Sequence, residues 1–173
     1  MLSEGRKKCF SDFFGFLIVS ISGCINHFLY QLSGGSSLLA PFVPINESIW
    51  EHLKLLFFPY VVLLLIEFFL CGREIPGFLF SGITGVLCGL IFIPSAYYLY
   101  TGITGKNFFL IDILIFFAAV YLSFRIRSSR LSKEPDNGIM KNISAFILIF
   151  CLSALFAGFT FFPPDSPLFE NPL

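Results

Sequence analysis

Long apolar runs alternate with short polar segments along the chain. Five runs are long enough to cross the hydrocarbon core of a bilayer, which takes about 20 helical residues at about 1.5 Å each. They cover roughly residues 10–32, 53–71, 78–100, 108–124 and 143–162. Because backbone polar groups cannot stay unpaired in hydrocarbon, each run is predicted to be an α-helix. The pattern therefore predicts an all-α fold, a polytopic membrane helix bundle with about five transmembrane helices, as a single domain over residues 1–173.

The positions of the basic residues predict the orientation of this bundle. Lys and Arg gather before the first run, at residues 6–8, and between the fourth and fifth runs, at residues 125–141, while Arg73 follows the second run. Only Lys54 and Lys106 fall on the opposite side. Since short cytoplasmic loops are enriched in Lys and Arg, we expect the N-terminus inside and the C-terminus outside, in a multi-pass protein of the cell (plasma) membrane.

The composition indicates that the membrane is the main partner of the chain. Hydrophobic residues make up 56% of the 173 residues and charged residues only 13%, well below the quarter that soluble domains carry. The formal net charge is zero, so the chain as a whole offers no basic field to a nucleic acid. We therefore expect contact with the lipid bilayer and no nucleic-acid partner.

The first run has a second interpretation as a lipoprotein signal. The tetrapeptide Ile21-Ser22-Gly23-Cys24 matches the bacterial lipobox pattern, in which the chain is cut before the cysteine and the cysteine is acylated. A lipoprotein that also keeps four spanning helices would be unusual, so an ordinary first helix is favoured over cleavage at Cys24.

Small residues recur at four-residue spacing in the third run, at Ser81, Gly85 and Gly89. Such a stripe lets the backbone of another helix approach closely. Packing inside the bundle is the favoured interpretation, and a helix of a partner molecule is the alternative.

The densest group of polar residues lies at 44–54, before the second run. On a helix, Glu47, Glu51 and Lys54 would share one face by their i, i+4 and i, i+3 spacing, with His52 on the neighbouring face. Two carboxylates, an amine and an imidazole would then be presented together.

A purely structural interpretation accounts for part of this group. Ser48-x-x-Glu51 matches a capping box, and Asn46 is an alternative N-cap. Acidic residues in a first turn also offset the helix dipole. Lys54 would lie at the membrane boundary and extend its long side chain to bring the ammonium to the interface. Capping does not explain His52.

Two ionisable residues in other runs are predicted to lie at the depth of this segment. His27 is near the outer end of the first run, and Asp112 is near the start of the fourth. Ionisable groups at membrane depth are costly and usually face a bundle interior or a water-filled cavity. A histidine bonded to a neighbouring helix is the commoner case, and a metal or catalytic role is the alternative.

A third ionisable residue, Glu67, lies in the second run, within reach of Arg73 at the membrane boundary. The sequence indicates no buried cation opposite Glu67, so a proton-relay role is not favoured.

A resemblance to a known family rests on the pattern Asn-Glu-Ser-x-Trp-Glu-His-Leu-Lys at residues 46–54. It extends to the segments 100–107, 110–114 and 161–164. The chain resembles an uncharacterised family of small multi-spanning bacterial membrane proteins, mainly of Firmicutes, grouped as a domain of unknown function. The resemblance implies a bacterial cell-membrane protein and no particular activity.

Three functions are compatible with these residues: the first two are favoured, the third is the alternative, and whether the chain is an enzyme stays open. The first is a lipid- or small-solute-binding protein with a polar site at the outer face, to which Asn46, Trp50 and Lys54 would contribute. The second is an accessory protein that docks other membrane proteins.

The third function is an outer-leaflet metal-dependent hydrolase. His27, His52 and a carboxylate from Glu47, Glu51 or Asp112 would hold a divalent metal such as zinc, because imidazole and carboxylate ligands suit that ion. The candidate catalytic residues are Glu47, Glu51 and His52. Neither His-Glu-x-x-His nor Gly-x-Ser-x-Gly occurs in the sequence.

Overall fold

The computed structural model describes residues 11–131 and 138–171, and these residues form five long helices and no strand. The helices are α2 (Asp12–Leu32), α3 (Ile49–Glu67), α4 (Phe78–Thr104), α5 (Phe109–Leu131) and α6 (Gly138–Phe161). A π-helical turn, η1 (Phe68–Gly72), continues α3. All five helices are long and apolar enough to cross a membrane, so the predicted all-α class with five spanning helices is confirmed. The basic residues 6–8 and Lys133 lie outside the described residues.

The helices start and end at capping groups rather than at the limits of the apolar runs. The Ser48 hydroxyl accepts a hydrogen bond from the Glu51 N–H at 3.3 Å, so α3 begins at Ile49 and not at residue 53. At the end of α4, Gly105 adopts a left-handed conformation, and its N–H donates to the Thr101 carbonyl at 2.8 Å. Helix α5 continues to Leu131, seven residues past its apolar run, because polar residues extend a helix readily outside hydrocarbon.

Helix α4 lies at the centre of the packing, and its small residues allow close approach of α5. A Cβ atom added at Gly85 would collide with the Ser123 carbonyl, and one at Gly89 would lie 3.1 Å from the Ala119 carbonyl. Ser81 is fully buried. The small-residue stripe therefore faces α5 and α3 of the same chain, where van der Waals contact between backbones holds helices together. The core around it includes Leu56, Phe57, Tyr60, Leu64, Phe78, Leu79, Ile83, Val86, Ala119, Val120 and Phe124.

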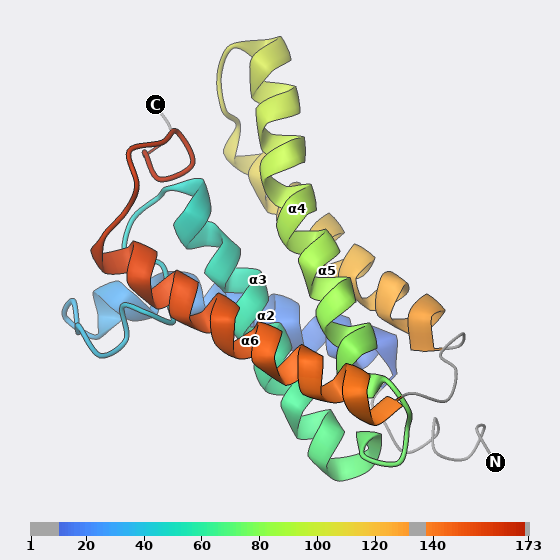
Figure 1. Cartoon of the computed structure of the whole chain (residues 1–173). Coiled ribbons are helices and arrows are strands. Elements are labelled where there is room, and N and C mark those ends of the chain that lie inside the picture. Colours follow the sequence, from blue (N-terminus) through green and yellow to red (C-terminus); the bar gives the residue numbers. More distant parts are fainter. Residues whose placement is uncertain (1–10, 132–137, 172–173) are drawn as a thin grey trace.

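The loop end of the α4–α5 hairpin is only partly covered by the rest of the protein. The last buried residue of α4 is Ile93 and the first of α5 is Ala119, and none of residues 94–118 between them is buried. Pro94 follows Ile93 directly, and a proline inside a helix removes a backbone hydrogen bond and favours a kink. Figure 1 shows the end of this hairpin projecting beyond the other helices.

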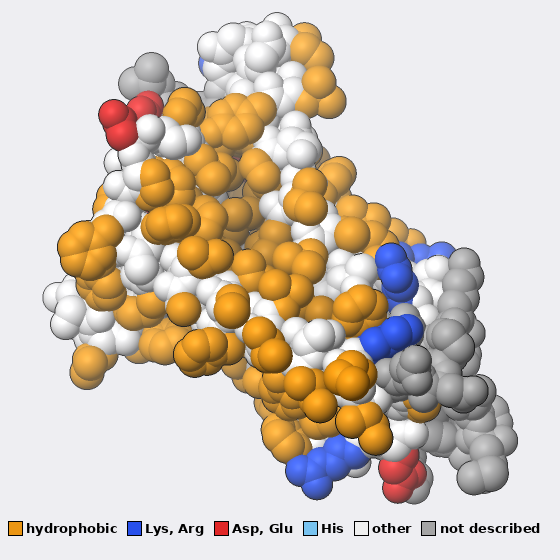
Figure 2. Space-filling view, in the orientation of Figure 1, with side chains coloured by type: hydrophobic (Ala, Val, Ile, Leu, Met, Phe, Trp, Pro, Cys, Tyr) orange, Lys and Arg blue, Asp and Glu red, His pale blue; other side chains and the backbone are white. Residues whose placement is uncertain are grey.

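The surface is apolar over the helices and charged mainly at the ends. Figure 2 shows hydrophobic side chains covering most of the visible face, with Lys and Arg gathered toward the lower right and the bottom of the view. Such an apolar surface suits contact with lipid chains. The end at which α2 finishes and α3 begins, called the site end below, also carries the α4–α5 loop and the end of α6. That this end faces outward stays a prediction from the basic residues.

Replacing Gly85 by alanine is expected to weaken the contact between α4 and α5. The new methyl group would meet the Ser123 backbone, which cannot rotate away, so the helices must move apart at a cost of about 1–3 kcal/mol. The control is Gly102→Ala on the same helix, where no described atom lies within 4 Å of the added Cβ. Thermal unfolding in detergent should show a lower midpoint for Gly85→Ala only. Equal midpoints would contradict this packing.

Candidate metal and ligand site

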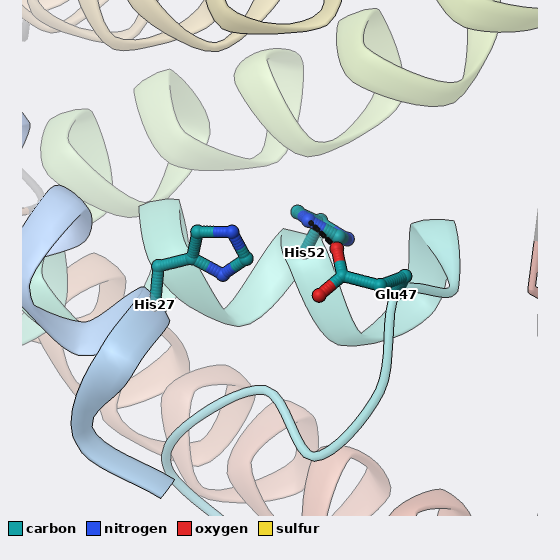
Figure 3. Close-up of side chains that lie close together, drawn as sticks. All are labelled: His27, Glu47 and His52. Atoms are coloured by element: carbon teal, nitrogen blue, oxygen red, sulfur yellow. Dashed lines mark ion pairs between the residues drawn. The ribbon is translucent and has the colours of Figure 1, made fainter. Parts of the chain in front are cut away.

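Three segments bring His27, Glu47 and His52 together at the site end. His27 comes from α2, Glu47 from the loop before α3, and His52 from the first turns of α3, as Figure 3 shows. His52 Nε2 lies 3.3 Å from Glu47 Oε2, and the two imidazole ring centroids are 5.3 Å apart. One ligand atom from each of the three residues lies within 4.8 Å of the others. Among the described residues this is the group of His, Cys, Asp and Glu that has the spacing for a metal ion.

The hydrogen bonding of His52 fixes which ring nitrogen faces the carboxylate. His52 Nδ1 lies 2.9 Å from the Ser48 carbonyl oxygen, which only accepts hydrogen bonds, so Nδ1 carries the proton. In the neutral ring, Nε2 then has a lone pair directed at Glu47. A lone pair and a carboxylate oxygen repel each other unless a proton or a metal ion lies between them. The arrangement therefore favours a cation at this point.

His27 supplies a second imidazole, and one of its two nitrogens has no hydrogen-bond partner among the described residues. Its Nδ1 atom is buried and makes no hydrogen bond to any described residue. Buried polar atoms in folded proteins nearly always have a partner, so a water molecule or a bound group is expected at this nitrogen. The ring lies toward His52, with the ring of Phe28 beside it at 5.1 Å between centroids.

A cavity of about 670 Å³ opens beside the three residues. Its walls come from α2, α3, α4 and α5 and are mostly apolar. Asp112 and Asn107 also line it, and Cys24, in the middle of the continuous α2, exposes its side chain at its edge. Asp112 accepts a hydrogen bond from the Tyr100 hydroxyl, and it is not part of the three-residue group. The predicted site residues His27, His52 and Asp112 thus share one cavity, in which Glu47 rather than Asp112 lies next to His52.

Glu51 and Lys54 point away from this cavity into a second polar group, the Lys54 junction. Lys54 is fully buried, and its ammonium donates to Glu51 Oε2 at 2.7 Å and to Thr160 Oγ1 at 2.6 Å. Two loop carbonyls share its remaining N–H, at 2.9 Å for Ala40 and 3.3 Å for Val43. The junction therefore joins the loop of residues 33–48, α3 and α6 around one buried ion pair.

The expectation that Glu47, Glu51 and Lys54 share a helix face is wrong. Ser48 is the N-cap, so Glu47 precedes the helix and does not follow its periodicity. This leaves the Glu47 carboxylate 61% exposed and free to face His52, whereas Glu51 is 2% exposed. The capping box is only half formed, because the Glu51 side chain accepts from the Ile45 N–H at 2.9 Å.

Asn46 and Trp50 have structural partners on the two sides of this cap. Asn46 Oδ1 accepts from the Ser48 N–H at 2.9 Å. The Trp50 backbone N–H donates to the Leu168 carbonyl at 3.0 Å, and its ring packs against Phe156 and Phe169. Both residues thus fix the start of α3 and do not line the cavity.

A buried ion pair at the other end of the bundle was missed by sequence reasoning. Glu67 Oε2 lies 2.6 Å from Arg127 Nη2, and the Arg127 guanidinium lies 4.8 Å from the centre of the Phe78 ring. The expectation that Glu67 reaches toward Arg73 is wrong, since Arg73 lies over the ring of Phe69. The periodicity of α5 was the signal that could have identified the pair. The buried positions of α5 follow helical spacing up to Arg127, and they are Ala119, Val120, Ser123, Phe124 and Arg127.

Comparison with known proteins identifies a family and no activity. A family model described as "Family of unknown function (DUF6512)" matches residues 6–173. No curated protein and no solved structure matches the chain.

Replacing Lys54 by methionine is expected to destabilise the protein strongly. The change leaves the Glu51 carboxylate buried without its cation, which typically costs about 3–5 kcal/mol. The control is Lys106→Met, because Lys106 is exposed. The measurement is the midpoint of thermal unfolding in detergent, and Lys54→Met/Glu51→Gln should recover part of the loss. A Lys54→Met midpoint equal to that of Lys106→Met would contradict the structural role of this junction.

Proposed function

The chain belongs to DUF6512, a family of unknown function, and we propose that it is a multi-pass membrane protein that binds one divalent transition-metal ion through His27, Glu47 and His52. Zinc is the ion that this ligand set suits best. The motif at residues 46–54 as a family signature and the occurrence in Firmicutes stay predictions. The site is placed at the outer face of the cell membrane on the positive-inside rule.

The observation that carries the proposal is the contact of His52 Nε2 with Glu47. The Ser48 carbonyl holds the proton of His52 on Nδ1, so the atom 3.3 Å from the Glu47 carboxylate is the one available to a metal. Metal-binding histidines commonly donate their other ring N–H to a backbone carbonyl, which sets the tautomer and the ring orientation. His52 has this arrangement without any further change.

The spacing of the three residues is also compatible with an ion of this size. Zinc binds imidazole nitrogen and carboxylate oxygen at about 2.0–2.2 Å, so its ligand atoms lie roughly 3.3 Å apart in a tetrahedral site. Glu47 and His52 have this separation, and the whole group lies within 4.8 Å. The remaining adjustment falls to the exposed Glu47 side chain and to the His27 ring, both of which rotate about side-chain bonds.

Three protein ligands leave one tetrahedral position for water or another molecule. Two histidines and a glutamate with an open position form the ligand set of several zinc hydrolases, in which the ion lowers the pKa of bound water and polarises a carbonyl. In this chain the open position would face the cavity, because His27, Glu47 and His52 all line it. An enzymatic activity at this site would therefore be metal-dependent hydrolysis.

Metal analysis of the purified protein tests the proposal directly. After exposure to zinc and dialysis without chelator, the wild-type protein should carry about one zinc per chain, whereas His27→Ala and His52→Ala should lose most of it. Elemental mass spectrometry gives the stoichiometry, and Glu170→Gln, an exposed acid outside the group, is the control. A wild-type protein without zinc, or variants that keep it in full, would refute the proposal.

The same assay distinguishes the two carboxylates that could complete the ligand set. Glu47→Gln should lower zinc affinity by about tenfold or more, because it removes an anionic ligand. Asp112→Asn should keep zinc, because Asp112 bonds to Tyr100 and lies outside the group. Competition with a fluorescent zinc indicator measures both affinities. Loss of zinc in Asp112→Asn with retention in Glu47→Gln would reverse the assignment.

A further inference from the structure

The cavity beside the three residues combines a polar end with long apolar walls. Its polar end is formed by His27, Glu47 and His52, and its walls include Leu55 of α3, Ile93 of α4, and Ile113 and Phe116 of α5. We infer that the cavity binds one lipid with an anionic phosphate head group, whose oxygen takes the open metal position while an acyl chain fills the apolar part. This inference rests on the metal site proposed above.

The route into the cavity is lateral, from the bilayer. Phe28 of α2 and Phe109 of α5 line the cavity and are themselves exposed, as is Cys24. They lie on the outer halves of helices long enough to span the membrane, so the exposed edge meets lipid chains rather than bulk water. His27 is five residues before the end of α2, about 8 Å along the helix axis. This depth is close to the boundary where lipid head groups meet hydrocarbon.

The charge balance at the polar end favours an anionic head group. A divalent ion with the single Glu47 carboxylate keeps a net positive charge, which attracts an anionic oxygen in a site of low polarity. The second carboxylate that faces the cavity, Asp112, accepts a hydrogen bond from the Tyr100 hydroxyl and lies outside the three-residue group, so its charge does not enter the ligand set of the ion. Asn107, whose side chain carries an amide N–H₂ donor, also lines the cavity.

The size and the composition of the cavity fit one chain of such a lipid. Cavities of roughly 300–1,000 Å³ with apolar walls and a few polar groups are typical of small-molecule sites, and this one has about 670 Å³. The α4–α5 hairpin forms one wall, and none of its residues between Ile93 and Ala119 is fully buried by the protein itself. A bound chain would cover apolar surface that the bundle leaves open.

Native mass spectrometry of the zinc-loaded protein released from detergent tests the inference with three probes. Dodecyl phosphate carries both the head group and the chain, inorganic phosphate carries the head group alone, and dodecanol carries the chain alone. We expect a one-to-one adduct with dodecyl phosphate whose occupancy exceeds that of either other probe by at least about tenfold. Equal occupancy with inorganic phosphate would indicate a site for free phosphate and overturn the lipid assignment.

Two neighbouring residues of α5 supply a matched pair of variants. Ile113 lines the cavity, whereas Leu114 is 59% exposed and does not line it. Ile113→Trp should lower the dodecyl phosphate adduct by at least about tenfold, while Leu114→Trp should keep it. Cys24→Phe and Cys151→Phe form a second pair, because both thiols are exposed and only Cys24 lines the cavity. An adduct that survives in both cavity variants would overturn the placement of the chain.

Zinc measured on the same samples separates the two proposals. The tryptophan and phenylalanine variants should keep zinc, since none of them replaces a ligand. Zinc in the wild-type protein without a dodecyl phosphate adduct would overturn the lipid inference and leave the metal site standing. Absence of zinc from the wild-type protein would overturn the metal site. An adduct of full occupancy in zinc-free His52→Ala would overturn coordination of the head group by the metal.

Discussion

The buried ammonium of Lys54 is the constraint on which the site end depends. A charge placed among apolar helices is costly unless acceptors surround it, so the fold must bring acceptors to it. It does so from three directions: Glu51 from the same helix, Thr160 from α6, and two carbonyls from the loop of residues 33–48. Near its end that loop carries Glu47, the carboxylate that faces His52. The arrangement around His52 is therefore held by an interaction in which none of the three site residues takes part.

A second buried ion pair complements the first at the other end of α3. Glu67 is thirteen residues after Lys54, about 20 Å along the helix, and it pairs with Arg127 of α5. In a lipid environment, apolar side chains gain little by exchanging contact with lipid for contact with one another. Helices are therefore aligned by close backbone contact and by polar pairs. Here Gly85 and Gly89 supply the close contact between α4 and α5. The two ion pairs, near the two ends of α3, fix its depth and rotation relative to its neighbours.

Much of the fold follows from the sequence, because the length of an apolar run nearly determines a spanning helix. The five helices and the cap at Ser48 were predictable on this basis. The sequence predicted only that His27 and His52 lie at the same depth in the membrane. The number and order of the helices give the depth of a residue but not the direction in which its side chain points around the helix axis. Hydropathy averaged along the chain carries no information on contacts between helices, so it could not predict the pairing of Glu67 with Arg127; the signal available was the helical spacing that puts Arg127 on the buried face of α5.

The position of Glu47 before helix α3 could have been predicted from the capping box that follows it. Treating residues 47–54 as one helix placed Glu47 beside Glu51, although the same capping box that includes Ser48 implies that the helix starts after it. A residue that precedes the N-cap by a single position does not follow the helical periodicity, so its side chain can point in another direction. The extension of α5 to Leu131 has a similar origin, because an apolar run marks where a helix meets lipid and not where it ends.

The packing of Trp50 has a spectroscopic consequence. Trp50 is the single tryptophan of the chain, and its ring lies among Phe156 and Phe159 of α6 and Phe169 of the C-terminal segment. All intrinsic tryptophan fluorescence therefore originates at one contact between α3, α6 and the C-terminal segment. The emission spectrum of the unlabelled protein reports whether these three segments are docked, at a position two residues from the histidine that faces Glu47.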